Sequence, residues 1–93
     1  MSYFAAMYVV ELEFTSDPRR LAARPAHRER LLAWHREGVL VMAGPWADDS
    51  GALLVFDVAD EAALRRLIDA DPYFRAPGVS VRRTSPWSPL DLS

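Results

Sequence analysis

The 93-residue sequence contains no cysteine and no lysine. Without cysteine, the chain has no disulfide, no thiolate nucleophile and no cysteine-based zinc site. All 11 basic residues are arginine, which we interpret as a compositional bias rather than as a set of recognition sites. The net charge is −2, and this balance argues against a nucleic-acid-binding protein, which would carry a basic surface.

Histidine is scarce as well, because the chain has only His27 and His35. Two metal ligands on one face of a helix stand one turn apart, whereas these two are separated by about two turns. The sequence therefore indicates neither a metal nor an organic cofactor.

Long hydrophobic runs are also missing, since none approaches the ~18 residues that a membrane-spanning helix needs. The N-terminus has no basic segment ahead of an apolar stretch, so we expect no signal peptide. These absences predict a cytoplasmic protein without membrane contact. Met7, where the first strand pattern begins, is an alternative start of translation.

The residues that are present suit one small domain over 1–93, with an N-terminal extension at 1–6 and a tail at 88–93. Apolar residues make up 51% of the chain, which is enough for a hydrophobic core. Alternating and helical periodicities predict strands and helices in the order βαββαβ. The expected strands are 7–14, 39–46, 52–58 and 79–87, and the expected helices are about 20–37 and the segment from Asp60 to Pro72.

This order predicts a ferredoxin-like α+β fold, in which two helices cover one face of an antiparallel sheet. The two middle strands, 39–46 and 52–58, are apolar on both faces, so the second face also needs a cover. A second copy of the chain is the simplest cover. We therefore expect a homodimer packed sheet to sheet, or a higher oligomer built from it.

Two residues stand out as candidates for chemistry, and each also has an ordinary interpretation. His27 shares the inward stripe of the first helix with Leu31 and Trp34, where a histidine more often packs than acts as a base. Asp71 extends the inward stripe of the second helix at its C-terminal end, where the helix dipole opposes a negative charge by ~0.3–1 kcal/mol. Pro72 follows, so Asp71 by itself favours an Asp-Pro turn.

The pair makes a sharper hypothesis than either residue alone. A carboxylate that accepts a hydrogen bond from one imidazole nitrogen fixes the tautomer and raises the basicity of the other nitrogen. Since no serine or cysteine nucleophile is evident beside the pair, the hypothesis favours proton abstraction over acyl transfer.

Several other residues have both an ordinary and a functional interpretation. Arg24 suits the surface, or it anchors an anionic substrate oxygen. Gly44 and Pro45 terminate a strand, or they form a backbone wall of a pocket. The remaining candidates are His35 at the surface or in packing, Trp46 and Trp87 in the core, at the dimer interface or along a pocket, and Arg65 and Arg66 on a solvated helix face.

Three motifs of the sequence resemble the YciI-like (YCII-related) proteins. They are "RPAHRERL" (24–31), "EGVLVMAGP" (37–45) and "DADPY" (69–73), and the last strand ends near Pro86 and Trp87, as in that family. The resemblance extends from about Met7 to Trp87. The combination is more specific than any one of its pieces.

The resemblance implies a ferredoxin-like fold in a dimeric α+β-barrel arrangement. It also implies that His27 and Asp71 form a His–Asp dyad, that Pro72 orients the dyad and that Arg24 joins the polar network of the cleft. One characterised type in the family is a dehydrochlorinase acting on a chlorinated hydroxyhydroquinone, and the superfamily also resembles muconolactone isomerases. The implied ligand is a small molecule, and the implied reaction begins with removal of a proton.

The sequence departs from the family pattern in two places. Only "WADDS" (46–50) separates the Gly-Pro pair from Gly51, where many members have a longer loop. Ala52 stands where members often carry a serine in the cleft, and Ser50 lies two residues earlier. Both departures bear on the substrate and on activity.

Two questions follow from the predicted fold. We expect both helices to run from the same end of the sheet, which would separate His27 from Asp71 by ~15 Å. The dyad then needs a first helix that begins near Arg20 with Pro25 as a kink, which we favour, or a site completed by the partner chain. Two functions remain open: an enzyme that uses His27 as base, Asp71 to orient it and Arg24 to steady negative charge, or a non-catalytic dimeric module that binds a small ligand or partner.

Overall fold

A computed structural model describes residues 2–3 and 7–93 of the chain. Its order of elements contains the expected βαββαβ unit, and the expected bounds differ from the observed ones by one or two residues at most. The elements are β1 (Ser2–Tyr3), β2 (Met7–Phe14), α1 (Arg19–Arg36), β3 (Leu40–Pro45), β4 (Gly51–Phe56), α2 (Glu61–Ala70), the 3-10 helix η1 (Pro72–Arg75), β5 (Val79–Trp87) and β6 (Leu90–Asp91).

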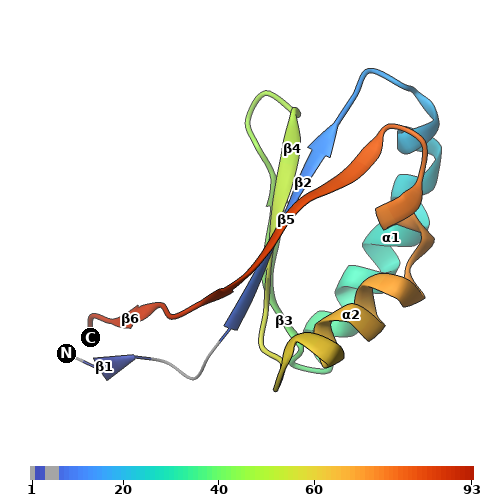
Figure 1. Cartoon of the computed structure of the whole chain (residues 1–93). Coiled ribbons are helices and arrows are strands. Elements are labelled where there is room, and N and C mark those ends of the chain that lie inside the picture. Colours follow the sequence, from blue (N-terminus) through green and yellow to red (C-terminus); the bar gives the residue numbers. More distant parts are fainter. Residues whose placement is uncertain (1, 4–6) are drawn as a thin grey trace.

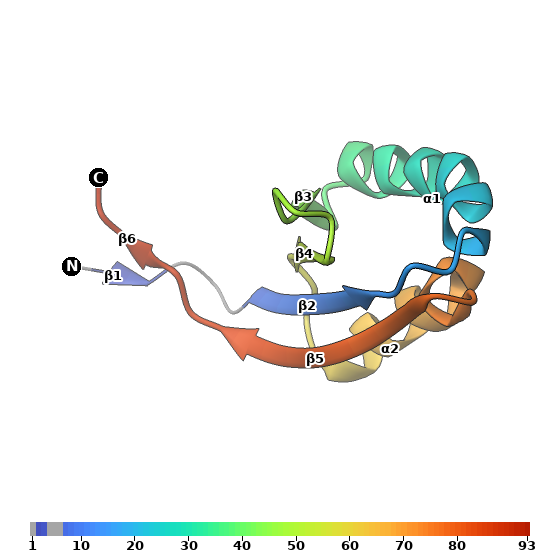
Figure 2. The same cartoon turned by 90° about the horizontal axis from the view of Figure 1, so that it is seen from above.

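The main sheet has the strand order β3-β4-β2-β5, and every neighbouring pair is antiparallel. Both helices lie on one side of this sheet, with α1 over β3 and α2 nearer β5 (Figures 1 and 2). The ferredoxin-like α+β fold is thereby confirmed. Among the described residues, no element of the chain covers the other face of the sheet (Figure 1).

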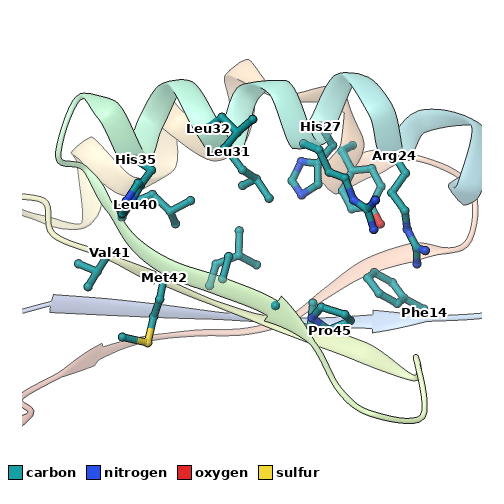
Figure 3. A pocket seen from close by; sticks show the side chains of 16 residues that line it. Phe14, Arg24, His27, Leu31, Leu32, His35, Leu40, Val41, Met42 and Pro45 are labelled. Atoms are coloured by element: carbon teal, nitrogen blue, oxygen red, sulfur yellow. The ribbon is translucent and has the colours of Figure 1, made fainter.

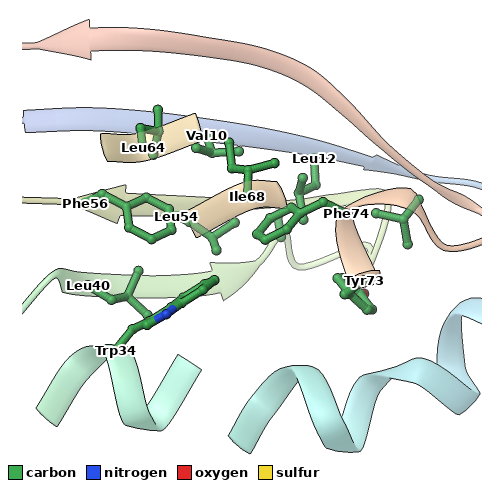
Figure 4. Close-up of a cluster of buried hydrophobic side chains, with 12 residues drawn as sticks. Val10, Leu12, Trp34, Leu40, Leu54, Phe56, Leu64, Ile68, Tyr73 and Phe74 are labelled. Atoms are coloured by element: carbon green, nitrogen blue, oxygen red, sulfur yellow. The ribbon is translucent and has the colours of Figure 1, made fainter. Parts of the chain in front are cut away.

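The core lies between the sheet and the helices, because alternate residues of the strands point toward the helix layer. In β2 the inward residues are Val10 and Leu12, which are 0% and 2% exposed. Trp34 of α1 and Leu64 and Ile68 of α2 close over them (Figure 4). Since these residues come from both halves of the chain, the two helices are fixed to one common surface.

Helix α1 is continuous through Pro25, which lies inside it. The Asp17 carboxylate accepts a hydrogen bond from the Arg19 backbone N–H at 3.0 Å and so satisfies a free donor at the helix start. The helix ends at Arg36, and Gly38, two residues later, has a φ of 82° that suits glycine. The expected early start of the helix is confirmed, and His27 falls in the middle of it.

The expected direction of the helices was wrong. Because β2 and β4 are antiparallel, the helices that follow them also run in opposite directions. The end of α2 therefore lies beside the first half of α1 rather than ~15 Å away from it (Figure 1). His27 and Asp71 meet within one chain, so neither a kink at Pro25 nor a partner chain is needed to bring them together.

Helix α2 begins as expected at Asp60, whose side chain accepts a hydrogen bond from the Ala63 backbone N–H at 2.8 Å. It ends at Ala70, and Asp71 then adopts an extended conformation with φ −112° and ψ 111°. This change of direction starts the short helix η1, which contributes Tyr73 and Phe74 to the core. Arg65 and Arg66 are exposed, as expected for a solvated helix face.

The two ends of the described chain pair with each other. Ser2 lies opposite Asp91 and Tyr3 opposite Leu90, and this short ribbon extends away from the helices (Figures 1 and 2). The expected tail at 88–93 therefore contains β6. Of the expected extension at 1–6, residues 1 and 4–6 lie outside the described part of the chain.

Of the three locations considered for Trp46 and Trp87, the core was wrong. Their side chains are 43% and 45% exposed in the single chain, so neither belongs to the buried core. Neither contributes to the cavity beside His27. Within the described ranges, no helix is long and apolar enough to span a membrane.

Candidate active site

His27 and Asp71 form a buried hydrogen-bonded pair. The Nδ1 atom of His27 lies 2.7 Å from Oδ2 of Asp71. The two residues are 6% and 4% exposed and come from positions 44 residues apart in the sequence. A buried carboxylate without a partner would be strongly destabilising, so each member accounts for the burial of the other.

Both interpretations of Asp71 hold at once. Its Oδ1 atom accepts a hydrogen bond from the Tyr73 backbone N–H at 3.0 Å, as expected of an Asp-Pro turn that caps η1. Its Oδ2 atom is left for His27. The turn therefore holds the carboxylate in the orientation that the imidazole requires, and Pro72 supplies the first residue of that turn.

Two aromatic rings fix the plane of the imidazole. The Tyr73 ring stacks on it with centroids 3.9 Å apart and planes at 10°, and the Phe74 ring meets it edge-on at 5.6 Å. Phe14 in turn meets the Tyr73 ring at 6.3 Å in an edge-on arrangement. These contacts restrict rotation of the ring, so the direction of its free nitrogen is defined before any ligand binds.

The surroundings keep the imidazole neutral near neutral pH. Burial lowers the pKa of His27 below its ordinary value of 6.5, and the hydrogen bond and charge of Asp71 oppose this effect. The positive charges of Arg24 and Arg28 lower the same pKa further. Since Asp71 accepts a hydrogen bond at Nδ1, that nitrogen carries the proton, and Nε2 presents a lone pair.

The Nε2 atom of His27 remains accessible. It forms no hydrogen bond to any residue in the described part of the chain. The only buried side-chain nitrogen or oxygen without a partner there is Nη1 of Arg20, so Nε2 itself is not sealed from solvent. A lone pair with no internal partner, opposite an orienting carboxylate, is the arrangement of a general base.

A cavity of about 510 Å³ lies beside this nitrogen, between α1 and the edge strand β3 (Figure 3). The side chains of His27 and Arg24 point from α1 into it (Figure 3). The lining is mostly apolar, and its charged residues are arginines alone. The remaining lining residues are Phe14, Arg28, Leu31, Leu32, His35, Leu40, Val41, Met42, Ala43, Gly44, Pro45, Ala52, Leu54 and Tyr73.

The sequence-predicted site residues divide between this cavity and a second one. Gly44 and Pro45 close β3 and also line the larger cavity, so both of their interpretations apply. Pro72 lines a second cavity of about 480 Å³ on the Asp71 side of the imidazole. Ala52 places a methyl group in the larger cavity, whereas Ser50 does not line it.

Arg24 is engaged by a residue that the sequence did not indicate. Its Nη2 atom donates to the Asp49 carboxylate at 3.0 and 3.3 Å, and Arg20 donates to the same carboxylate at 3.1 Å. Asp49 belongs to the short loop after β3 and has a positive φ of 59°. Two arginines at adjacent turns of the predicted helix, Arg20 and Arg24, and two aspartates in the later loop were the sequence features that could have indicated this contact.

His35 lies at the far end of the larger cavity from Arg24 (Figure 3). Its Nδ1 atom donates to the Leu40 carbonyl oxygen at 2.9 Å, and no carboxylate contacts it. It therefore lacks the orienting group that His27 has. The described residues also contain no group of three or more histidine, aspartate or glutamate side chains able to hold a metal ion.

The sequence profile of the YCII-related domain matches residues 1–88. The chain belongs to the YCII-related family. Two curated relatives, both Protein YciI, come from Escherichia coli O6:H1 and Shigella flexneri. Each is 33% identical to this chain, and the match covers 75% of this chain and 84% of the relative.

A solved member of the same fold is 5-chloro-2-hydroxyhydroquinone dehydrochlorinase (TftG) from Burkholderia phenoliruptrix AC1100, in complex with 2,5-dihydroxybenzoquinone. It superposes with a TM-score of 0.70 at 15% sequence identity, and the match covers 87% of this chain and 92% of that one. At this identity the similarity establishes the fold of this YCII-related chain alone, which is the ferredoxin-like α+β fold.

Proposed function

We propose that this YCII-related protein is an enzyme in which His27 removes a proton from a small molecule bound between α1 and β3. The observation that carries the proposal is the 2.7 Å contact between Nδ1 of His27 and Oδ2 of Asp71, with Nε2 left free beside the cavity. Asp71 orients the ring and stabilises the imidazolium that forms. The proton moves from a C–H or O–H bond of the ligand to Nε2.

Removal of the proton leaves an electron pair on the ligand. This negative charge must be stabilised and then consumed in a second step. The positive charges of Arg24 and Arg28 line the same cavity and stabilise negative charge that develops on the ligand. The pair then either expels a leaving group, as in a dehydrochlorination, or takes a proton back at another atom, as in an isomerisation. Both reactions start with the same step, so a lyase and an isomerase are both compatible with the site.

An exchange experiment tests this proposal without knowledge of the natural substrate. A panel of hydroxyquinones, chlorinated hydroquinones and small lactones is incubated with the protein in D₂O, and deuterium incorporation and chloride release are measured. We expect wild type to exchange or convert at least one compound about 10²-fold faster than His27→Gln. Glu29→Gln, on the exposed side of the same helix, should keep the wild-type rate. Equal rates for wild type and His27→Gln across the panel would refute the proposal.

A non-catalytic ligand-binding module is the second candidate. Ala52 supports this function, because it lines the cavity with a methyl group where other YCII-related proteins often have a serine hydroxyl. In that case the pair stabilises the fold, and ligands of the panel bind without turnover. Binding measured by NMR together with an unchanged ligand would favour this function.

We also propose that a second copy of the chain covers the open face of the sheet. On that face Val9 lies opposite Val55, and Met42 lies opposite Val55 on the other side, which forms an apolar row across three strands. Met42 is 63% exposed. Trp87, opposite Met7, extends the apolar area and is 45% exposed, so a symmetric sheet-to-sheet dimer would bury the exposed Met42 and Trp87 side chains.

A further inference from the structure

Arg20 and Arg24 stand one helical turn apart on α1 and converge on a single carboxylate. Nη2 of Arg20 lies 3.1 Å from Oδ2 of Asp49, and Nη2 of Arg24 lies 3.0 Å from Oδ1. Both guanidinium groups lie over the Phe14 ring, at 4.8 and 6.0 Å from its centroid. Since Phe14 and Arg24 also line the cavity of His27, this arginine pair borders the proposed active site.

The arginine pair has more donors than Asp49 satisfies. Arg20 donates through Nε to the Thr15 carbonyl oxygen at 2.8 Å and through Nη2 to Asp49, but its Nη1 atom is buried without a partner. The Arg20 side chain is only 11% exposed. A buried, charged donor without an acceptor is costly, so the Asp49 carboxylate does not fully satisfy the arginine pair.

Asp49 is not required for the loop that carries it. Its backbone N–H donates to the Trp46 carbonyl oxygen at 2.9 Å, and the Trp46 N–H donates to the Gly51 carbonyl oxygen at 2.9 Å. These bonds close the turn without the carboxylate. The hydrogen bond from Arg20, with the nearby charge of Arg24, lowers the pKa of Asp49, so its side chain is an anion at neutral pH.

Asp49 thus resembles a ligand carboxylate that the protein supplies itself. The cavity next to it has arginines and no acidic residue in its lining, and its floor is aromatic and aliphatic. Arg24 and His27 stand three positions apart on one helix, so their side chains face the same ligand at a spacing of about 5–6 Å between Cβ atoms. An anionic group at Arg24 would therefore place the body of a small ligand beside His27.

We infer that the ligand is a small carboxylate with an apolar, preferably aromatic, body, and that its carboxylate displaces Asp49 from Arg24. This inference names the substrate class of the proposed active site and rests on that proposal. Exchange of one carboxylate for another at the arginines gains little by itself, so Asp49 disfavours inorganic anions. Only a ligand that also buries apolar surface against Phe14 and Tyr73 gains net affinity.

Benzoate is the probe for this inference, and benzamide is its neutral counterpart of the same shape. Asp49→Asn removes the competing charge, and asparagine tolerates a positive φ, so the turn is kept. We expect benzoate to bind Asp49→Asn about tenfold more tightly than wild type in an NMR or calorimetric titration. Benzamide should show no such gain, and Arg24→Gln in the Asp49→Asn background should abolish it.

Asp48→Asn is the matched control. Asp48 is adjacent in the same loop and carries the same charge, but its carboxylate accepts from the Ser50 backbone N–H at 3.0 Å and contacts no arginine. Benzoate affinity should equal that of wild type in this variant. An equal gain in Asp48→Asn, an equal gain for benzamide, or no gain in Asp49→Asn would each overturn the inference.

A second variant protects the test against a folding defect. Asp49→Gly also accepts the positive φ and removes the carboxylate, and the same gain in benzoate affinity is expected for it. Benzoate binding requires no proton transfer. The titration can therefore fail while His27-dependent deuterium exchange persists, and the exchange can fail while the gain in benzoate affinity remains.

Discussion

Tyr73 contacts both members of the His–Asp pair, with its ring stacked on His27 and its backbone N–H bonded to the Asp71 carboxylate. The ring contact lies at 3.9 Å between centroids, and the N–H donates at 3.0 Å. One residue thus fixes the plane of the imidazole and the direction of the carboxylate. The orientation of the pair depends on η1 as much as on the two helices.

Replacement of Tyr73 by leucine should destabilise the protein by about 1–3 kcal/mol, because the stacked ring is lost and the buried volume is refilled imperfectly. The measurement is the free energy of unfolding in urea. Tyr73→Phe keeps the ring and should lie within about 0.5 kcal/mol of wild type. A large loss in Tyr73→Phe would show that the hydroxyl, rather than the ring, is the stabilising group.

Asp71→Asn should lower the pKa of His27 below its wild-type value. The hydrogen bond and charge of Asp71 raise that pKa against the effect of burial, and asparagine removes the charge. Titration of the imidazole signals by NMR measures the change, and His35 serves as the internal reference because no carboxylate contacts it. An unchanged His27 titration would mean that the pair does not exist in solution.

Stability should fall on mild acidification because of His27. The folded protein holds this imidazole at a lowered pKa, whereas the unfolded chain protonates it near 6.5. Below that pH the unfolded state binds the additional proton, so the free energy of unfolding decreases until the pH reaches the lower, folded-state pKa. His27→Gln should lack this component. The difference between the two unfolding curves as a function of pH would then vary across that window, and a constant difference would contradict the expectation.

Gly51→Ala should lower the free energy of unfolding by about 2–3 kcal/mol, because a methyl group there would collide with the Leu12 backbone carbonyl oxygen in the adjacent strand. Gly44 is the matched control. A methyl group at Gly44 would meet nothing within 4 Å, so Gly44→Ala should be close to wild type in the same urea titration. Equal losses in both variants would show that the loss in Gly51→Ala does not come from the collision with Leu12.

Val9→Asp should convert the proposed dimer to a monomer, since it places a charge within the apolar row on the open face of the sheet. Analytical ultracentrifugation measures the mass, and circular dichroism checks that the chain stays folded. Arg65→Glu, on the exposed side of α2, should leave the mass unchanged. A monomeric wild-type protein would refute the sheet-to-sheet dimer.

The strands and caps were predictable from the sequence because their signals are local. The alternation in "MYVVELEF" gives β2 with its observed bounds, and Asp60 caps α2 through a bond to Ala63 three residues later. The pairing of His27 with Asp71 was a correct hypothesis reached without correct geometry. The expected separation ignored the antiparallel course of the helices, which follows from strand pairing rather than from any local pattern.

The residues next to Asp49 and Phe14 in the sequence do not indicate that these two side chains lie at the site. Asp49 lies 25 and 29 residues from the arginines that it contacts, and its loop conformation determines where its carboxylate points. Phe14 looked like any inward residue of a strand, but its position at the end of β2 puts it beneath the arginine pair. Such contacts depend on the assembled fold.

The opposite directions of α1 and α2 make the acid–base pair a product of the finished tertiary structure. The base belongs to the first βαβ half of the chain and the carboxylate to the second, so neither half contains the pair. A chain that has collapsed but not yet docked its two halves leaves His27 without its carboxylate. The pair therefore forms only when the two halves have docked, and its presence reports that they have joined.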